Sequence, residues 1–122
     1  LSISEDIEND KIFKELIVRI IEDQSNVKSE VEAFDAFLNA TKLDQKNINA
    51  FYGLGGIYNY RKEHEKAALA FKTVIKLDPT HFNARYSLGF TYEKLGKTQL
   101  AELEYERYRS LKKRFESMIK EE

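Results

Sequence analysis

The sequence contains one pattern written twice, with the two copies 34 residues apart and no insertion or deletion between them. The first copy consists of Phe51, Leu54, Gly55, Tyr58, Ala67, Phe71 and Pro79. In the second copy, the same positions hold Arg85, Leu88, Gly89, Tyr92, Ala101, Tyr105 and Lys113. An internal repeat of this length is typical of a solenoid, in which each unit buries its apolar face against its neighbours.

Each copy predicts two amphipathic helices joined by a short polar turn, because its apolar residues recur at steps of three and four. Pro79 ends the second helix of the first copy, since the residue before a proline is driven out of the α region. Thr80 is the expected N-cap of the next helix, and Gly96 is expected to cap its C-terminus. Lys113 stands where a proline stop would be, so the last helix should run from about Thr98 to about residue 120.

A third, degenerate copy is predicted over residues 14–47. Its second half keeps Ala33 and Phe37 in register with the repeat, and Ser29 with Glu32 forms a capping box that would begin a helix there. Residues 10–24 carry an apolar stripe that suits a first helix. Residues 1–13 are expected to be an N-terminal extension of that helix or a frayed tail.

This pattern resembles the tetratricopeptide repeat, in which an aromatic residue, Leu-Gly, Tyr, Ala, Phe and Pro recur over about 34 residues. The resemblance implies an all-α fold: a right-handed α-α superhelix of about three helix pairs with an extended C-terminal helix. We expect one domain over residues 14–122, with repeats at 14–47, 48–81 and 82–115. The family also implies a surface that binds protein rather than a catalytic site.

The composition agrees with a protein partner. The 122 residues carry a net charge of -1 with 34% charged residues, whereas nucleic acids and anionic membranes call for a basic excess. No apolar run approaches the ~20 residues that cross a bilayer. There is no cysteine, and His64 and His81 are expected to be solvated loop residues without a ligand cluster. We therefore expect no metal, no cofactor and no enzyme activity.

The cellular compartment is not specified by the sequence. The first residues lack the basic start and apolar centre of a signal peptide. Because no initiator methionine is present, we expect a mature or excised fragment, which leaves open a signal or anchor that has been removed. The cytoplasm is the default expectation.

The run of glycines at residues 53–56 could suggest a phosphate-binding loop, but such loops follow a strand and open a helix. These glycines lie inside a predicted helix next to core residues. We expect Gly55 to allow close approach of the paired helix, and Gly53 and Gly56 to leave a shallow spot on the opposite side.

The resemblance implies that the first helix of each repeat lines a concave groove. The residues expected to face this groove and bind a peptide segment of a partner are Asn49, Tyr52, Asn59, Tyr60, Asn83, Tyr86, Phe90 and Lys94. Amides can bond to an extended backbone, and tyrosine offers flat apolar area at low entropic cost. We expect Tyr52, Asn59 and Tyr86 to dominate the binding energy. The alternative is a merely polar solvent surface.

A second candidate surface lies on the last helix, where an apolar stripe is formed by Tyr108, Leu111, Phe115 and Met118. This stripe is expected to fold onto Leu88 and Tyr92. Otherwise it would form a homodimer or dock another part of a longer protein, so that the chain would be a structural self-assembly element.

The charges of the last helix run from acidic to basic along its length. Glu102, Glu104 and Glu106 come early, which suits the helix dipole and gives ion pairs along a solvated face. A phosphate or RNA site in the later basic cluster is the alternative.

Overall fold

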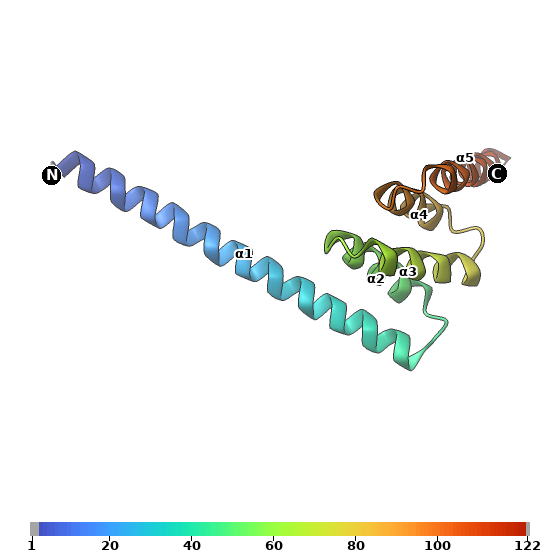
Figure 1. The fold of residues 1–122 in the computed structure, drawn as a ribbon, viewed down its shortest axis with the longest axis horizontal. Coiled ribbons are helices and arrows are strands. Elements are labelled where there is room, and N and C mark those ends of the chain that lie inside the picture. Colours follow the sequence, from blue (N-terminus) through green and yellow to red (C-terminus); the bar gives the residue numbers. More distant parts are fainter. Residues whose placement is uncertain (1–2, 122) are drawn as a thin grey trace. The chain divides into compact units, whose positions relative to one another are not determined.

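The computed structural model describes residues 3–121, with side chains described over 11–120 except 21 and 25. It contains five α-helices in the order α1 (Ile3–Leu43), α2 (Ile48–Tyr60), α3 (His64–Leu77), α4 (Phe82–Lys94) and α5 (Thr98–Glu121) (Figure 1). The chain divides into two compact units, Leu1–Ala33 and Phe34–Glu122, and each is described by itself. The all-α fold predicted from the sequence is confirmed.

The second unit reproduces the repeat of the sequence in its helix limits. Both α2 and α4 have 13 residues, and α4 and α5 begin 34 residues after α2 and α3. The N-caps are equivalent as well: the side chain of Asn47 accepts from the N–H of Ala50, and Nδ1 of His81 accepts from that of Ala84, each at 3.0 Å.

The predicted N-cap of α4 was therefore wrong by one residue. Thr80 points back to the preceding turn, where its N–H and its hydroxyl both donate to Oδ1 of Asp78, at 3.0 and 2.7 Å. These bonds stabilise the ionised carboxylate, and the side-chain bond is the largest cause of a lowered pKa of Asp78. His81 is left to cap the helix.

Both helix pairs turn through a residue with positive φ. Gly96 has a φ of 74° after α4, as the sequence predicted, and Lys62 has a φ of 63° at the equivalent place after α2. The N–H of the following residue donates to the carbonyl of Tyr92 or Tyr58 at 2.8 Å, which closes a Schellman-type cap. The two turns therefore have the same conformation, but the residue with positive φ is a glycine only in the second turn.

The N-terminal part differs from the helix pair predicted over 14–47. Residues 3–43 form one continuous helix, α1, and no turn separates its halves. The stretch from Gln24 to Ser29 contains neither glycine nor proline, and serine followed by glutamate three residues later is also compatible with a helix interior. Residues 3–13 extend this helix. The predicted domain limits, 14–122, stay a prediction.

The end of α1 nevertheless packs as the second half of a repeat would. The ring of Phe34 meets Tyr58 edge-on, with 5.6 Å between centroids, and the guanidinium of Arg61 lies 4.3 Å from the centroid of Phe34. A Cβ added to Gly53 would come within 2.6 Å of the ring of Phe37. Gly53 therefore admits this ring and does not leave the shallow spot that we expected.

The core of the second unit lies between α3, α4 and α5. Its buried cluster consists of Ala67, Ala68, Phe71, Leu88, Tyr92 and Ala101. Gly55 and Gly89 allow the two helices of each pair to approach, because a Cβ would come within 2.6 Å of Phe71 and 2.7 Å of Tyr105, respectively. The expected role of Gly55 is thus seen in the structure.

The last helix continues past the end of the repeat, as the missing proline predicted, and reaches Glu121. No helix in the described part of the chain is both long enough and apolar enough to span a bilayer.

Candidate functional site

The first helices of the two repeats, α2 and α4, are joined by a seam of polar contacts. The Nδ2 group of Asn59 donates to Oγ1 of Thr91 at 2.8 Å, and the hydroxyls of Tyr52 and Ser87 lie 3.5 Å apart. Oδ1 of Asn59 is also 3.0 Å from Nδ1 of His64. Because the contacts of Asn59 with Thr91 and of Tyr52 with Ser87 link residues more than 30 apart, they fix one repeat against the next, whereas the contact with His64 lies within the first repeat.

Because of these contacts, the side chains of Tyr52 and Asn59, which we expected to face the groove, are half-buried. The ring of Tyr52 meets Phe71 edge-on at 5.7 Å between centroids and lies 5.1 Å from the ring of His81. Part of the aromatic surface that we assigned to a ligand is already in contact with the protein.

The rest of the predicted set is exposed along α2 and α4. Tyr60 is 74% exposed, Tyr86 52% and Phe90 40%. Asn49, Asn83 and Lys94 are exposed as well. The ammonium of Lys94 lies 5.3 Å from the centroid of Phe90, so that a cation covers part of this ring. The surface thus combines aromatic rings, amides and one cation.

Gly56 leaves a shallow depression in this surface. Nothing lies within 4 Å of a Cβ added there, whereas the equivalent position of the next repeat carries the ring of Phe90. The shallow spot predicted from the sequence is therefore present at Gly56 alone.

Three tyrosines gather between α4 and α5. The ring of Tyr86 lies 5.4 Å from that of Tyr105 and 5.1 Å from that of Tyr108. Burial is the main cause that raises the pKa of Tyr105 to about 12, and a hydrogen bond to the carboxylate of Glu93 adds to it. The phenol of Tyr105 is thus held in its neutral form beside the exposed ring of Tyr86.

The stripe predicted on α5 is partly covered. Tyr108 and Leu111 are half-buried, whereas Phe115 is 50% exposed and Met118 60%. The ring of Phe82 lies 6.2 Å from Tyr108 and 5.8 Å from Phe115. The stripe therefore meets the start of α4, while Leu88 and Tyr92, the expected contacts, pack in the core with Ala101.

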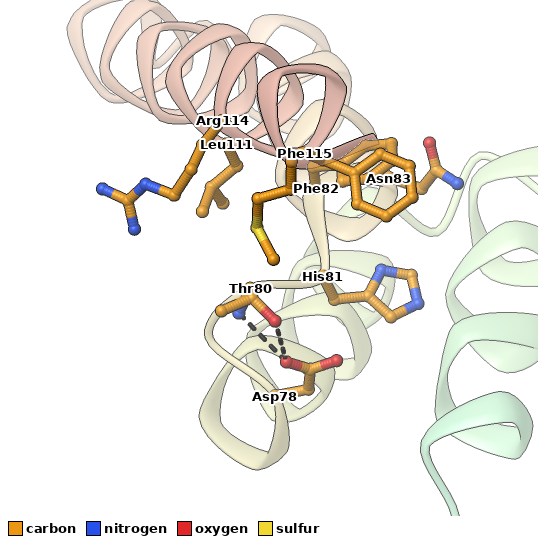
Figure 2. Close-up of a pocket in the computed structure, with 9 residues that line it drawn as sticks. Asp78, Thr80, His81, Phe82, Asn83, Leu111, Arg114 and Phe115 are labelled. Carbon is orange, nitrogen blue, oxygen red and sulfur yellow. Dashed lines mark hydrogen bonds between the residues drawn. The ribbon is translucent and has the colours of Figure 1, made fainter. Parts of the chain in front are cut away.

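A pocket of about 470 Å³ opens beside this stripe (Figure 2). Phe82, Leu111, Phe115 and Met118 form its apolar part, and Asp78 and Arg114 contribute opposite charges. Figure 2 shows that one side comes from the loop between α3 and α4 and the other from α5. The remaining lining residues are Thr80, His81 and Asn83.

Comparison with known families agrees with this geometry. The family model described as "TPR repeat" matches residues 55–96, and the one described as "Tetratricopeptide repeat" matches residues 82–115. The chain belongs to the tetratricopeptide repeat family. Proteins of this family are in general non-catalytic modules for protein interaction or scaffolding, and the repeats of this chain support that role.

Several solved tetratricopeptide repeat structures resemble the chain. "Crystal structure of MamA" is 26% identical with a TM-score of 0.70, covering 75% of this chain and 53% of that one. "Crystal structure of MamA protein" is 28% identical with a TM-score of 0.65, covering 71% and 48%. "MamA AMB-1" is 19% identical with a TM-score of 0.66 and covers 72% and 52%. The chain thus spans about half the length of these proteins. No curated protein matches the sequence.

One cluster departs from the tetratricopeptide repeat pattern and was missed by the sequence reasoning. Arg85 stands where the first repeat has Phe51, and its Nη1 lies 3.2 Å from Oε2 of Glu104. Oε1 of Glu104 also binds Nη1 of Arg107 at 2.9 Å. Glu104 is only 6% exposed, so its expected place on a solvated face was wrong.

The signal for this pair was present in the sequence. Glu104 occupies the position that Ala70 holds in the previous tetratricopeptide repeat, 34 residues earlier. An aromatic residue and alanine are therefore exchanged together for arginine and glutamate, and a comparison of the two copies would have shown it.

The two histidines of the chain have structural contacts and are not solvated loop residues. His81 caps α4, and His64 begins α3 beside Asn59. Both are half-buried. Among the described residues, no group of three or more histidine, aspartate or glutamate side chains is placed to hold a metal ion.

Proposed function

We propose that the chain binds an extended segment of a partner protein across the exposed faces of α2 and α4, without catalysis. The observation that carries this proposal is the exposure of Tyr86 and Phe90, two neighbouring aromatic side chains of one helix that remain 52% and 40% accessible. Aromatic side chains left accessible together on a surface are typical of a contact site.

The surrounding groups suit a peptide backbone. Asn49 and Asn83 are exposed at equivalent positions of the two repeats, and each amide can donate and accept. Gly56 provides an open place in which a partner side chain could lie. Tyr60 and Lys94, near the ends of the same helices, extend the surface. The exposed faces of α2 and α4 therefore suit a partner peptide that places an apolar side chain against this surface, with its flanking backbone beside the amides.

Tyr52 and Asn59 belong to the proposed site, but they are poor positions for a test. Both are bonded to the neighbouring repeat, so an alanine there would alter the repeat packing together with any ligand contact. Phe90 and Tyr86 are better positions, because both are exposed and neither is bonded to the other repeat. The ring of Tyr86 also contacts Tyr105 and Tyr108 on α5, so the urea midpoint of the variant is measured beside its affinity.

The test begins with selection of peptides from a displayed library on the purified chain. Affinity is then measured by fluorescence anisotropy for the wild type and for the double variant Tyr86→Ala/Phe90→Ala. Losing two anchors should cost about 2 kcal/mol or more, a roughly thirty-fold rise in Kd. Leu69→Ala is the control, because Leu69 is 65% exposed on α3. Equal affinity of the double variant and the wild type would refute the proposal.

A second candidate is self-assembly through α5, which is favoured by the pocket beside Phe115. Its apolar lining could receive a side chain from another copy, since Phe115 and Met118 keep half or more of their surface accessible. Light scattering at several concentrations tests this candidate. A wild-type oligomer that Phe115→Glu dissociates would support it, and a monomer at every concentration would eliminate it.

A further inference from the structure

The N-terminal helix α1 carries an apolar stripe with a heptad spacing. Its members are Phe13, Ile17, Ile20, Gln24, Val27 and Val31, which alternate steps of four and three residues. Only Gln24 is polar. A mean spacing of 3.5 residues is the pattern of a coiled-coil seam, with Ile17, Gln24 and Val31 at the a positions and the other three at d.

This seam is accessible along its whole length. Phe13, Ile17, Ile20, Val27 and Val31 are between 40% and 62% exposed. The β-branched residues are modest helix formers, and helical stability in proteins comes mostly from packing of an apolar face. A helix with this composition therefore requires a partner for the seam.

The heptad spacing of this seam continues into the second unit, where its apolar positions already pack against other residues. Phe34 and Leu38 are the next two positions of the heptad, and both are half-buried. Phe34 packs edge-on against Tyr58. The apolar stripe of α1 is thus an interface in its last part and open in residues 13–31.

We propose that residues 13–31 of α1 form a parallel, in-register coiled coil with other copies of this chain. Gln24 is the first argument for an identical partner. In a parallel, in-register arrangement, its amide meets the same amide of the other copy, and each can donate to the other. An apolar partner residue would leave the buried amide without a hydrogen bond, which is costly.

The charges beside the seam favour the same arrangement. Asp23 occupies a g position and Lys28 the e position that follows, and in a parallel pair these two positions meet between helices. Asp23 of each copy would therefore lie beside Lys28 of the other. In an antiparallel pair over the same span, Lys28 of one copy would instead lie beside Lys14 of the other, and Gln24 of one copy beside Ile20 of the other.

The residue types also indicate the number of strands. Ile and Val occupy both a and d positions, and β-branched residues at both favour three or more strands over two. We therefore expect a trimer, with a mass of about three times the 14.3 kDa of the chain. This assembly is independent of the proposed peptide site on α2 and α4.

The first test is the mass of the full chain in solution, by sedimentation equilibrium or light scattering. Ile20→Lys places a charge in the seam and should reduce the mass to that of a monomer, with the helical circular dichroism of the repeat unit retained. Val18→Lys is the matched control, because Val18 is 52% exposed on the same helix but off the seam, against 55% for Ile20. It should leave the mass unchanged.

A monomeric wild type would overturn the proposal. So would an oligomer that survives Ile20→Lys but dissociates with Phe115→Glu, which would assign assembly to α5.

The second test establishes orientation, because the chain has no cysteine of its own. Phe13→Cys and Val31→Cys are prepared separately and oxidised. Parallel helices bring identical positions together, so each variant alone should form a covalent dimer. In an antiparallel pair, identical residues near either end lie about 27 Å apart along the helix, so neither variant would cross-link. An oligomer without either cross-link would contradict the parallel arrangement.

Discussion

Substituting alanine at Gly55 and Gly56 separates two effects of a glycine in a helix. Both residues lie inside α2, and alanine at either position gains about 0.5–1 kcal/mol of helix propensity over glycine. They differ in surroundings. A Cβ at Gly56 meets nothing within 4 Å, whereas at Gly55 it comes within 2.6 Å of the ring of Phe71, against an ordinary contact distance of 3.4 Å or more.

The ring of Phe71 has little room to move away. It is 2% exposed and packs edge-on against Tyr52. Overfilling a packed core costs about 1–3 kcal/mol, so Gly55→Ala should be less stable than Gly56→Ala by about that amount and, after the gain in propensity, less stable than the wild type by up to about 2.5 kcal/mol. Gly56→Ala should be stabilising by about 0.5–1 kcal/mol.

Urea unfolding followed by helical circular dichroism measures both values against the wild type. Adding Phe71→Leu to each variant tests the cause: the smaller side chain should remove most of the penalty of Gly55→Ala and leave the effect of Gly56→Ala unchanged. If Gly55→Ala is as stable as Gly56→Ala in the presence of Phe71, close approach is not the reason for glycine at this position.

Three further predictions concern the turns, the ion pair and the buried phenol of the second unit. Lys62→Gly should raise the free energy of unfolding by about 0.5–1 kcal/mol and Gly96→Lys should lower it by a similar amount, because φ is positive at both; urea midpoints of the two variants check this. Glu104→Ala should cost about 3 kcal/mol by leaving the guanidinium of Arg85 without a carboxylate, with only the carbonyl of Pro79 as a partner, whereas Arg85→Phe/Glu104→Ala should come within about 1 kcal/mol of the wild type or exceed it, in the same assay. Because the pKa of Tyr105 is raised to about 12 from 10, its contribution to stability is complete below pH 10 and decreases as the pH rises toward 12, so Tyr105→Phe should flatten the alkaline decline of urea midpoints.

The limits of α2 to α5 were predictable because local residues set them. Pro79 stops α3, and Gly96 supplies the positive φ after α4. The continuity of α1 was not predicted, because the repeat pattern suggested a turn between Gln24 and Ser29. No glycine or proline ends the helix in this stretch, so α1 continues through it.

The candidate site was predictable in its outline and not in its contacts. Steps of three and four along one helix indicate which residues share a face, so the exposure of Tyr86 and Phe90 followed. The partners of Asn59 and Tyr52 lie on the next repeat, and the rotation between two repeats is set by core packing. The sequence alone does not determine that rotation.

The exchange of Phe51 and Ala70 for Arg85 and Glu104 has a consequence for how such repeats recombine. Phe51 occurs with Ala70 in one helix pair, and Arg85 occurs with Glu104 in the other. A chimera that moved α4 without α5 would place the guanidinium of Arg85 opposite an alanine. The unit that can be duplicated or grafted is therefore the whole hairpin, with both partners inherited together. A crossover within the hairpin would leave the chain with a half-buried charge that has no carboxylate beside it.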